Sequence, residues 1–171
     1  MAKRLRRPET KGRLKQNTSG MAVQNQRMED DLRFMREAFK LARQAFEAGE
    51  VPVGAVVVAD GRIIGKGYNL TETLHDATAH AEMQAFTAAA EYLGGKYLTD
   101  CTLYVTLEPC CMCAGAAYWT QISRIVYGAD DPKRGCSRVR PSLLHPKTVF
   151  ERGLMAEESR ALLQAFFNER R

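Results

Sequence analysis

The sequence has few of the features that mark membrane or secreted proteins. None of its apolar runs approaches the roughly 20 residues that a membrane-spanning helix needs. The basic N-terminus is not followed by an apolar segment, so we expect no secretory signal. Cysteine is scarce and odd in number, and three of the five fall at positions 110, 111 and 113. This clustering favours reduced thiols or metal ligands over a disulfide framework, and therefore a reducing compartment such as the cytoplasm.

The folded part of the chain also lacks an excess of charge. With 171 residues, the chain is shorter than the roughly 250 at which proteins usually divide into several domains. Its net charge of +5 is concentrated in residues 1–20, which hold seven basic residues and one acidic residue. We expect residues 1–28 to form a flexible basic arm and residues 29–171 to form one nearly neutral domain. The arm contacts nucleic-acid phosphates, or is a solvated extension, or is sequence upstream of a true start at Met21 or Met28.

Hydrophobic periodicity predicts the elements of that domain. Apolar residues recur at three- and four-residue steps between residues 30 and 49, which predicts an amphipathic helix. A β-hairpin is predicted where Asp60-Gly61 separates two β-rich runs, 51–59 and 62–68. Further helices are predicted from Thr78 as N-cap, from Pro109 and from residue 156, with further strands over 101–107, 122–128 and 148–151. This order predicts an α/β fold with three layers, αβα, around a mixed sheet of about five strands.

Two short runs, T-A-H-A-E at 78–82 and E-P-C-C-M-C at 108–113, carry candidate metal ligands. If Pro109 begins a helix, Cys110 and Cys113 lie on one face of its first turn, where the helix N-terminus favours thiolates. Together with a neutral His80 imidazole they form a ligand set that zinc prefers. Cys111 is rotated by about 100° from Cys110 on the helix, so we expect it to be buried in the core instead.

These three ligands leave the fourth zinc position undecided. A closed structural site would take a fourth ligand from His75, Cys111 or Cys136, whereas an open site would hold a water that zinc acidifies. Glu82 follows His80 by two residues and does not share its helix face, so it is not expected to bind the metal. Its carboxylate is instead a candidate to move a proton from the water to a leaving amine.

The two runs resemble the H-x-E and P-C-x-x-C signature of the zinc-dependent nucleobase deaminases. From about Met28 to the C-terminus, the chain is most similar to bacterial tRNA-specific adenosine deaminases, in segments such as E-V-P-V-G-A-V-V-V and L-L-Q-A-F-F-N-E-R-R. The resemblance implies a cytidine deaminase-like fold over residues 29–171, with one zinc per subunit at His80, Cys110 and Cys113, and Glu82 as the catalytic residue. It also implies conversion of adenosine to inosine at the wobble position, with the tRNA anticodon loop as partner, and a homodimer.

Asn69 aligns with an asparagine of that family that contacts the target nucleotide, so the resemblance makes it a candidate substrate-binding residue. A buried amide beside an extruded base could read that base by hydrogen bonds. The alternative is an ordinary turn residue after a strand. Asp130 and Asp131 are candidates for substrate contact or for a solvated loop.

Some residues differ from the family pattern and leave other functions open. Ala77, Leu70-Thr71 and the pair Tyr118-Trp119 fall on segments expected to border the pocket or a subunit contact. A Tyr-Trp pair at this place is similar to guanine deaminases, so the first alternative is deamination of guanine or another free base or nucleoside. A second alternative is a noncatalytic RNA-binding module with structural zinc, which requires a fourth protein ligand.

Overall fold

A five-stranded sheet between two pairs of helices forms the body of the protein. The computed structural model describes residues 11–170, with side chains from residue 20 onward. The elements in chain order are α1 (Lys11–Glu47), β1 (Gly54–Ala59), β2 (Arg62–Tyr68), α2 (Ala81–Leu93), β3 (Thr102–Leu107), α3 (Cys111–Thr120), β4 (Arg124–Ala129), the 3-10 turn η1 (Cys136–Arg138), β5 (Val149–Arg152) and α4 (Ala156–Asn168). None of the helices in this range is long and apolar enough to cross a membrane.

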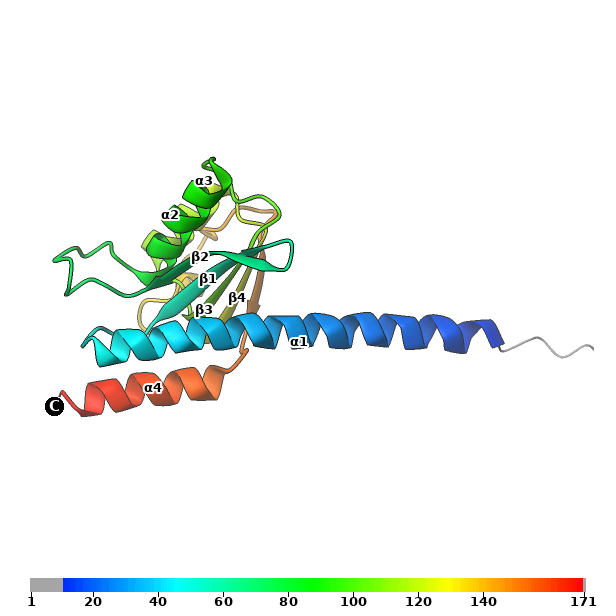
Figure 1. Ribbon diagram of the computed structural model, residues 1–171, viewed down its shortest axis with the longest axis horizontal. Coiled ribbons are helices and arrows are strands. Elements are labelled where there is room, and N and C mark those ends of the chain that lie inside the picture. Colours follow the sequence, from blue (N-terminus) through cyan, green and yellow to red (C-terminus); the bar gives the residue numbers. More distant parts are fainter. Residues whose placement is uncertain (1–10, 171) are drawn as a thin grey trace, which may run out of the picture.

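The sheet is mixed, as the element order predicts. Its strand order is β2-β1-β3-β4-β5. Strand β1 pairs antiparallel with β2 and β3, whereas β4 pairs parallel with β3 and β5. Helices α1 and α4 cover one face and α2 and α3 the other (Figure 1). The three-layer αβα architecture and the hairpin at Asp60-Gly61 are therefore confirmed.

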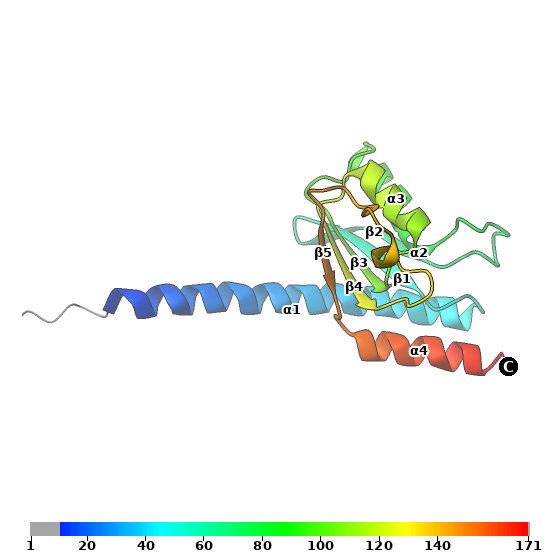
Figure 2. The same cartoon turned by 180° about the vertical axis from the view of Figure 1, so that it is seen from behind.

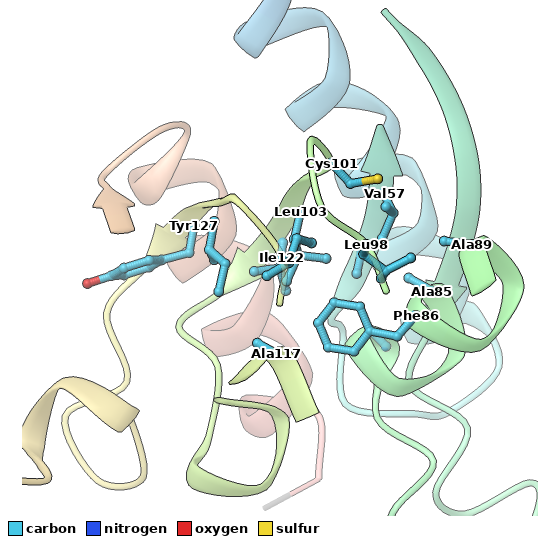
Figure 3. Close-up of a cluster of buried hydrophobic side chains, with 14 of the residues drawn as sticks. Val57, Ala85, Phe86, Ala89, Leu98, Cys101, Leu103, Ala117, Ile122 and Tyr127 are labelled. Atoms are coloured by element: carbon cyan, nitrogen blue, oxygen red, sulfur yellow. The ribbon is translucent and has the colours of Figure 1, made fainter. Parts of the chain in front are cut away.

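The apolar side chains alternate along the strands and fill both faces of the sheet. On β1, Ala55 and Val57 belong to the cluster beneath α2 and α3, while Val56 and Val58 belong to the cluster beneath α1. Figure 3 shows the first cluster, which brings together Phe86 of α2, Leu98 of the loop after α2 and Leu103 of β3. Because both faces are buried, the central strands read as continuous apolar runs and hold the helices on either side in place.

Helix α1 begins earlier than the sequence predicts. The apolar period starts near residue 30, but the helix runs from Lys11. The side chains of residues 20–28 are exposed, so this stretch has no core contact that would impose an apolar period. Figure 2 shows the N-terminal half of α1 projecting beyond the sheet. Residues 1–10 of the predicted arm lie outside the described residues, and the division at residue 28 stays a prediction.

A charged network ties α1 to the starts of the parallel strands. Arg124, the first residue of β4, donates hydrogen bonds to both oxygens of Asp31 on α1, at 2.7 Å each. Tyr104 of β3 donates to the same carboxylate at 2.6 Å, and Glu151 of β5 accepts from Arg124 Nε at 2.7 Å. Bidentate Arg–carboxylate pairs fix geometry well. This network lies near the end of the sheet where β4 begins, whereas Cys110 follows β3 at the opposite end.

Two glycines let α2 approach the sheet closely. A methyl group added at Gly65 would overlap the carbonyl oxygen of Ala85, and one added at Gly67 would overlap that of Ala81. Both glycines lie on β2, so the backbone of α2 rests directly on that strand. Gly67 faces the first turn of α2, which follows His80 directly. The position of this candidate ligand therefore depends on the absence of a side chain at residue 67.

We expect Gly67→Ala to lower the free energy of unfolding by about 1 to 3 kcal/mol, since overpacking a tight contact has a cost of that size. The change should also weaken metal binding, because it displaces the start of α2. Chemical denaturation and zinc titration measure the two effects. Gly95→Ala is the matched control, because an added methyl there meets nothing within 4 Å. Equal stability of the two variants would contradict this account of the α2 contact.

Candidate metal centre

The candidate ligands lie at the N-termini of two neighbouring helices. His80 is the N-cap of α2 and Cys110 the N-cap of α3, both with extended backbones. The predictions of Thr78 as N-cap and of Pro109 within the helix are therefore wrong by two residues each. Thr78 instead donates from its amide and hydroxyl to the carboxylate of Asp76, both at 2.7 Å. Since Cys113 is the third residue of α3, it still lies on the same face as Cys110.

The spacing of the three ligand atoms matches a tetrahedral zinc site. His80 Nδ1 lies 3.6 Å from Cys110 Sγ and 3.6 Å from Cys113 Sγ. All three atoms lie within 4.8 Å of one another. Tetrahedral zinc with Zn–S bonds of about 2.3 Å and Zn–N bonds of about 2.0–2.1 Å requires an N···S separation of about 3.6 Å. The donor set and its geometry therefore fit zinc without rearrangement.

No fourth protein ligand joins this group among the residues that the structure describes. His75 lies on an exposed loop, and Cys136 is buried without joining the cluster. Cys111 is exposed, so the prediction that it is a core cysteine is wrong. It is the first residue of α3, and the side of the helix away from Cys110 and Cys113 is not covered at that point. The donor set thus has three members, as in catalytic zinc sites.

The thiols differ in their affinity for protons. The hydrogen bond from Cys113, with help from His80 and against the effect of burial, lowers the pKa of the Cys110 thiol to about 4. The same Cys110–Cys113 contact and burial raise the pKa of the Cys113 thiol. The Cys110 contact also raises the pKa of His80, while burial and the positive charge of Arg134 oppose this shift. The cluster therefore already favours one thiolate, the form that binds metal.

Glu82 lies in the first turn of α2 and is almost completely buried. Burial is the main cause that raises the pKa of its carboxyl group to about 7, and the negative charge of Cys110 adds to it. Hydrogen bonds from its own backbone amide and from Cys113, together with the charge of His80, oppose the shift. A carboxyl group with a pKa near neutrality can both accept and donate a proton at physiological pH. The structure thus places a suitable acid–base group beside the ligands.

Asn69 lies on the loop between β2 and α2, close to the start of the ligand run. The backbone amide of Leu70 donates to the carbonyl oxygen of Ala79 at 2.9 Å, which holds this loop next to His80. The Asn69 side chain is buried, and its Nδ2 donates to Glu50 Oε2 at 3.2 Å and to Thr71 Oγ1 at 3.1 Å. It is therefore more than a solvated turn residue.

Glu50 is a buried carboxylate that the sequence analysis missed. Besides Asn69, it accepts from the backbone amide of Glu72 at 3.2 Å and from that of Thr73 at 2.7 Å. These bonds lower the pKa of Glu50 even though burial alone would raise it. One carboxylate thus holds the whole 69–73 loop. The available signal was a single acid directly before a predicted buried strand, a position where a charge needs partners.

A second buried carboxylate, that of Glu108, lies between β3 and Cys110 and was also missed. Its two oxygens accept from the backbone amides of Asp131 and Ser137, at 3.0 and 2.9 Å. The two aspartates singled out from the sequence act nearby: Asp130 accepts from the Tyr127 hydroxyl at 3.0 Å, and Asp131 accepts from two amides of its own turn. They shape the loop after β4.

Tyr118 and Trp119 lie in the last turns of α3. Their rings contact each other at a centroid distance of 5.8 Å, and Tyr118 also lies 5.5 Å from His145. Trp119 is 77% exposed, so it does not belong to the core of the described chain. An exposed tryptophan beside a partly exposed tyrosine is an apolar surface of the kind found at protein interfaces.

Comparison with known proteins places the chain in a family. The family model described as "Cytidine and deoxycytidylate deaminase zinc-binding region" matches residues 28–129. The tRNA-specific adenosine deaminases of Bacillus subtilis (strain 168) and Agrobacterium fabrum (strain C58) are each 46% identical over 150 residues, which cover 84% of this chain and 92% and 98% of the relatives.

Solved structures agree with this placement. A structure from a study of A-to-I editing by tRNA:A34 deaminases superposes with a TM-score of 0.72 at 43% identity, covering 76% of this chain and 98% of the other. Guanine deaminase from Bacillus subtilis superposes with a TM-score of 0.56 at 35% identity, covering 79% and 92%. The chain therefore belongs to the tRNA-specific adenosine deaminase family, within the cytidine and deoxycytidylate deaminases that share a zinc-binding region.

Proposed function

We propose that the protein is a zinc-dependent hydrolase that converts adenosine to inosine at the wobble position of tRNA. The observation that supports this most directly is the three-ligand cluster at zinc spacing with the buried carboxyl group of Glu82 beside it. The 46% identity to tRNA-specific adenosine deaminases over most of the chain supports adenosine in tRNA as the substrate.

In this proposal His80, Cys110 and Cys113 hold the metal. Zinc bound there would lower the pKa of a water molecule toward neutrality and so supply the nucleophile. The imidazole offers its Nδ1 to the site, and the two sulfurs lie at equal distances from that nitrogen. His80 and Cys110 lie at the N-termini of α2 and α3. The partial positive charge of a helix N-terminus stabilises the negative charge of a thiolate.

Glu82 moves the protons of the reaction. Its carboxylate accepts a proton as water adds to C6 of adenine, and the carboxylic acid then donates that proton to the departing amine. The products are inosine and ammonia, so the atoms of one adenosine and one water are conserved. Because burial raises the pKa of Glu82 to about 7, neither protonation state is strongly disfavoured at neutral pH.

Asn69 contacts the target nucleotide in this proposal. The reacting base must leave its stack to enter the site, and a buried amide near the metal can then bind it by hydrogen bonds. The bonds from Asn69 Nδ2 to Glu50 and Thr71 hold the amide in one orientation. The substrate-binding group is thus fixed before the RNA arrives, which reduces the entropy lost on binding.

We further propose a cytoplasmic homodimer with one zinc per subunit that binds the tRNA anticodon loop, with residues 29–171 as the deaminase domain and residues 1–28 as a basic arm. The exposed Tyr118-Trp119 pair supports a subunit contact on α3, because a second subunit would remove this apolar surface from water.

Guanine deamination is the second candidate function. The Tyr118-Trp119 pair and the 35% identity to a guanine deaminase support it.

The C-terminal segment that contains helix α4 supports tRNA as the substrate instead, since its L-L-Q-A-F-F-N-E-R-R sequence resembles the tRNA-specific family. This helix packs on the C-terminal part of α1 through Phe166 and Phe46, whose rings lie 5.6 Å apart, and Arg170 Nη2 donates to the carbonyl oxygen of Gly49 at 2.5 Å.

Ammonia release separates these two functions. We expect turnover of a tRNA anticodon stem-loop with adenine at the wobble position, and none of free guanine, adenosine or cytidine under the same conditions. A stem-loop with guanine at that position is the matched control and should release no ammonia. Turnover of free guanine without turnover of the stem-loop would show that guanine, and not adenosine in tRNA, is the substrate. The proposed zinc chemistry would be unaffected.

Glu82→Ala should retain zinc but lose turnover by at least about 100-fold, the lower range for removal of a general acid–base group. The carboxylate is not a ligand in this proposal, so zinc content measured by atomic absorption should match that of the unaltered protein. Cys113→Ala is the contrasting variant and should lose both zinc and activity. Near-normal turnover by Glu82→Ala would refute the proton-transfer role.

Removal of residues 1–20 tests the basic arm. If its cations contact phosphates, truncation should weaken stem-loop binding and flatten the dependence of affinity on salt, because fewer counterions are released. A full-length variant in which the seven basic residues of this segment are replaced by glutamine separates charge from chain length. Unchanged salt dependence in both proteins would show that the arm is a passive extension.

A further inference from the structure

Glu108 is a buried charge that the proposed chemistry does not use. It is only 4% exposed, yet its carboxylate forms no ion pair within the described part of the chain. Its Oε2 accepts from the Asp131 amide and its Oε1 from the Ser137 amide. A buried ionised group is costly unless hydrogen bonds compensate it. Here both oxygens accept hydrogen bonds from one loop, residues 131–137.

This loop packs on the segment that carries a candidate zinc ligand. The amide of Cys136 donates to the carbonyl oxygen of Pro109 at 2.9 Å, and Gly135 pairs with Cys110 in an isolated antiparallel bridge. A methyl group added at Gly135 would overlap the carboxyl group of Glu108. The loop is therefore wrapped around the Glu108 carboxylate and lies beside the metal cluster.

The loop presents a positive charge next to that cluster. Arg134 is exposed, precedes the bridging Gly135 and forms no ion pair among residues 20–170. Asp131 forms no ion pair with Arg134; its Oδ1 instead accepts from the backbone amides of Lys133 and Arg134 at 2.9 and 3.0 Å. Arg134 nevertheless lies next to the site in the chain, because the following residue, Gly135, forms the bridge with Cys110.

We propose that Glu108 is a positioning residue for RNA binding. Its carboxylate holds the 131–137 loop so that Arg134 contacts an RNA phosphate beside the candidate zinc ligands. This inference rests on the proposed tRNA substrate. Glu108 itself touches neither the RNA nor the metal. A guanidinium is well suited to the contact, because its planar donors match phosphate oxygens.

A carboxylate suits this position better than an amide. An ionised carboxylate accepts at both oxygens, and here each oxygen receives one backbone N–H. Glutamine has the same size, but its NH₂ group would face one of those N–H donors. Glu108→Gln therefore removes one of the two bonds that hold the loop and leaves the side-chain volume unchanged.

The test is a double-mutant cycle on stem-loop binding by the zinc-loaded full chain at several salt concentrations. Arg134→Gln should weaken binding by about tenfold, the equivalent of one charged hydrogen bond, and should lower the salt slope by about 0.7 to 0.9. Glu108→Gln should have a similar effect, and the double variant should bind no more weakly than either single variant. Such non-additivity is the sign that both residues act through one contact.

Glu50→Gln is the matched control, because it alters the other buried carboxylate and the other loop. Its effect on binding should add to that of Arg134→Gln. Hydrogen exchange should also be faster at the Asp131 and Ser137 amides in Glu108→Gln, with zinc content and the exchange of the 69–73 loop unchanged. A role of Glu108 in stability alone would not produce this pattern.

Additive effects of Glu108→Gln and Arg134→Gln would overturn the inference. If Glu108→Gln does not fold, Arg134→Gln still tests it, because an unchanged salt slope for this exposed variant would exclude the phosphate contact. If the unaltered protein does not bind the stem-loop at all, the proposed substrate fails and the inference fails with it. If the unaltered protein binds the stem-loop but the effects of the two substitutions are additive, the inference about Glu108 is refuted and the proposed substrate is not.

Discussion

The convergence of two helix N-termini at one end of the sheet is the constraint on which the functional site depends. Two His80–cysteine separations of 3.6 Å require the starts of α2 and α3 to stay fixed relative to each other. The parallel pairing of β3 and β4 and the close contact of α2 with β2 supply that rigidity. The charged network around Arg124 ties α1 to β4 at the opposite end of the sheet.

Buried carboxylates contribute to the surroundings of the candidate ligands in two different ways. Glu50 and Glu108 each accept backbone amides and so hold the loops on the two sides of the site. Glu82 is buried as well, but it keeps a pKa near 7 and can exchange protons. For Glu50 the difference follows from hydrogen bonding, since amide donors lower the pKa of a carboxyl group that burial alone would raise.

Local signals in the sequence predicted the framework, and tertiary contacts explain what they missed. The hairpin at Asp60-Gly61, the mixed sheet and the grouping of His80 with Cys110 and Cys113 follow from turn chemistry, periodicity and ligand spacing. The start of α1 was missed because its exposed first half lacks an apolar stripe.

The other errors have equally local causes. Thr78 and Pro109 resemble helix starts, but the caps are the ligand residues themselves, which the tertiary structure holds in extended conformations. Cys111 is exposed because nothing covers that side of α3. The roles of Glu50 and Glu108 depend on amides more than 20 residues away in the chain, and no local pattern encodes such contacts.

X-ray absorption at the zinc edge of the zinc-loaded protein tests the central claim most directly. An open three-ligand centre predicts two sulfur ligands at about 2.3 Å, one imidazole nitrogen at about 2.0–2.1 Å and a fourth light atom from solvent. A third sulfur or a second imidazole would show that a fourth protein ligand, such as Cys111, Cys136 or His75, closes the site. That result would contradict a hydrolytic centre and favour a structural zinc.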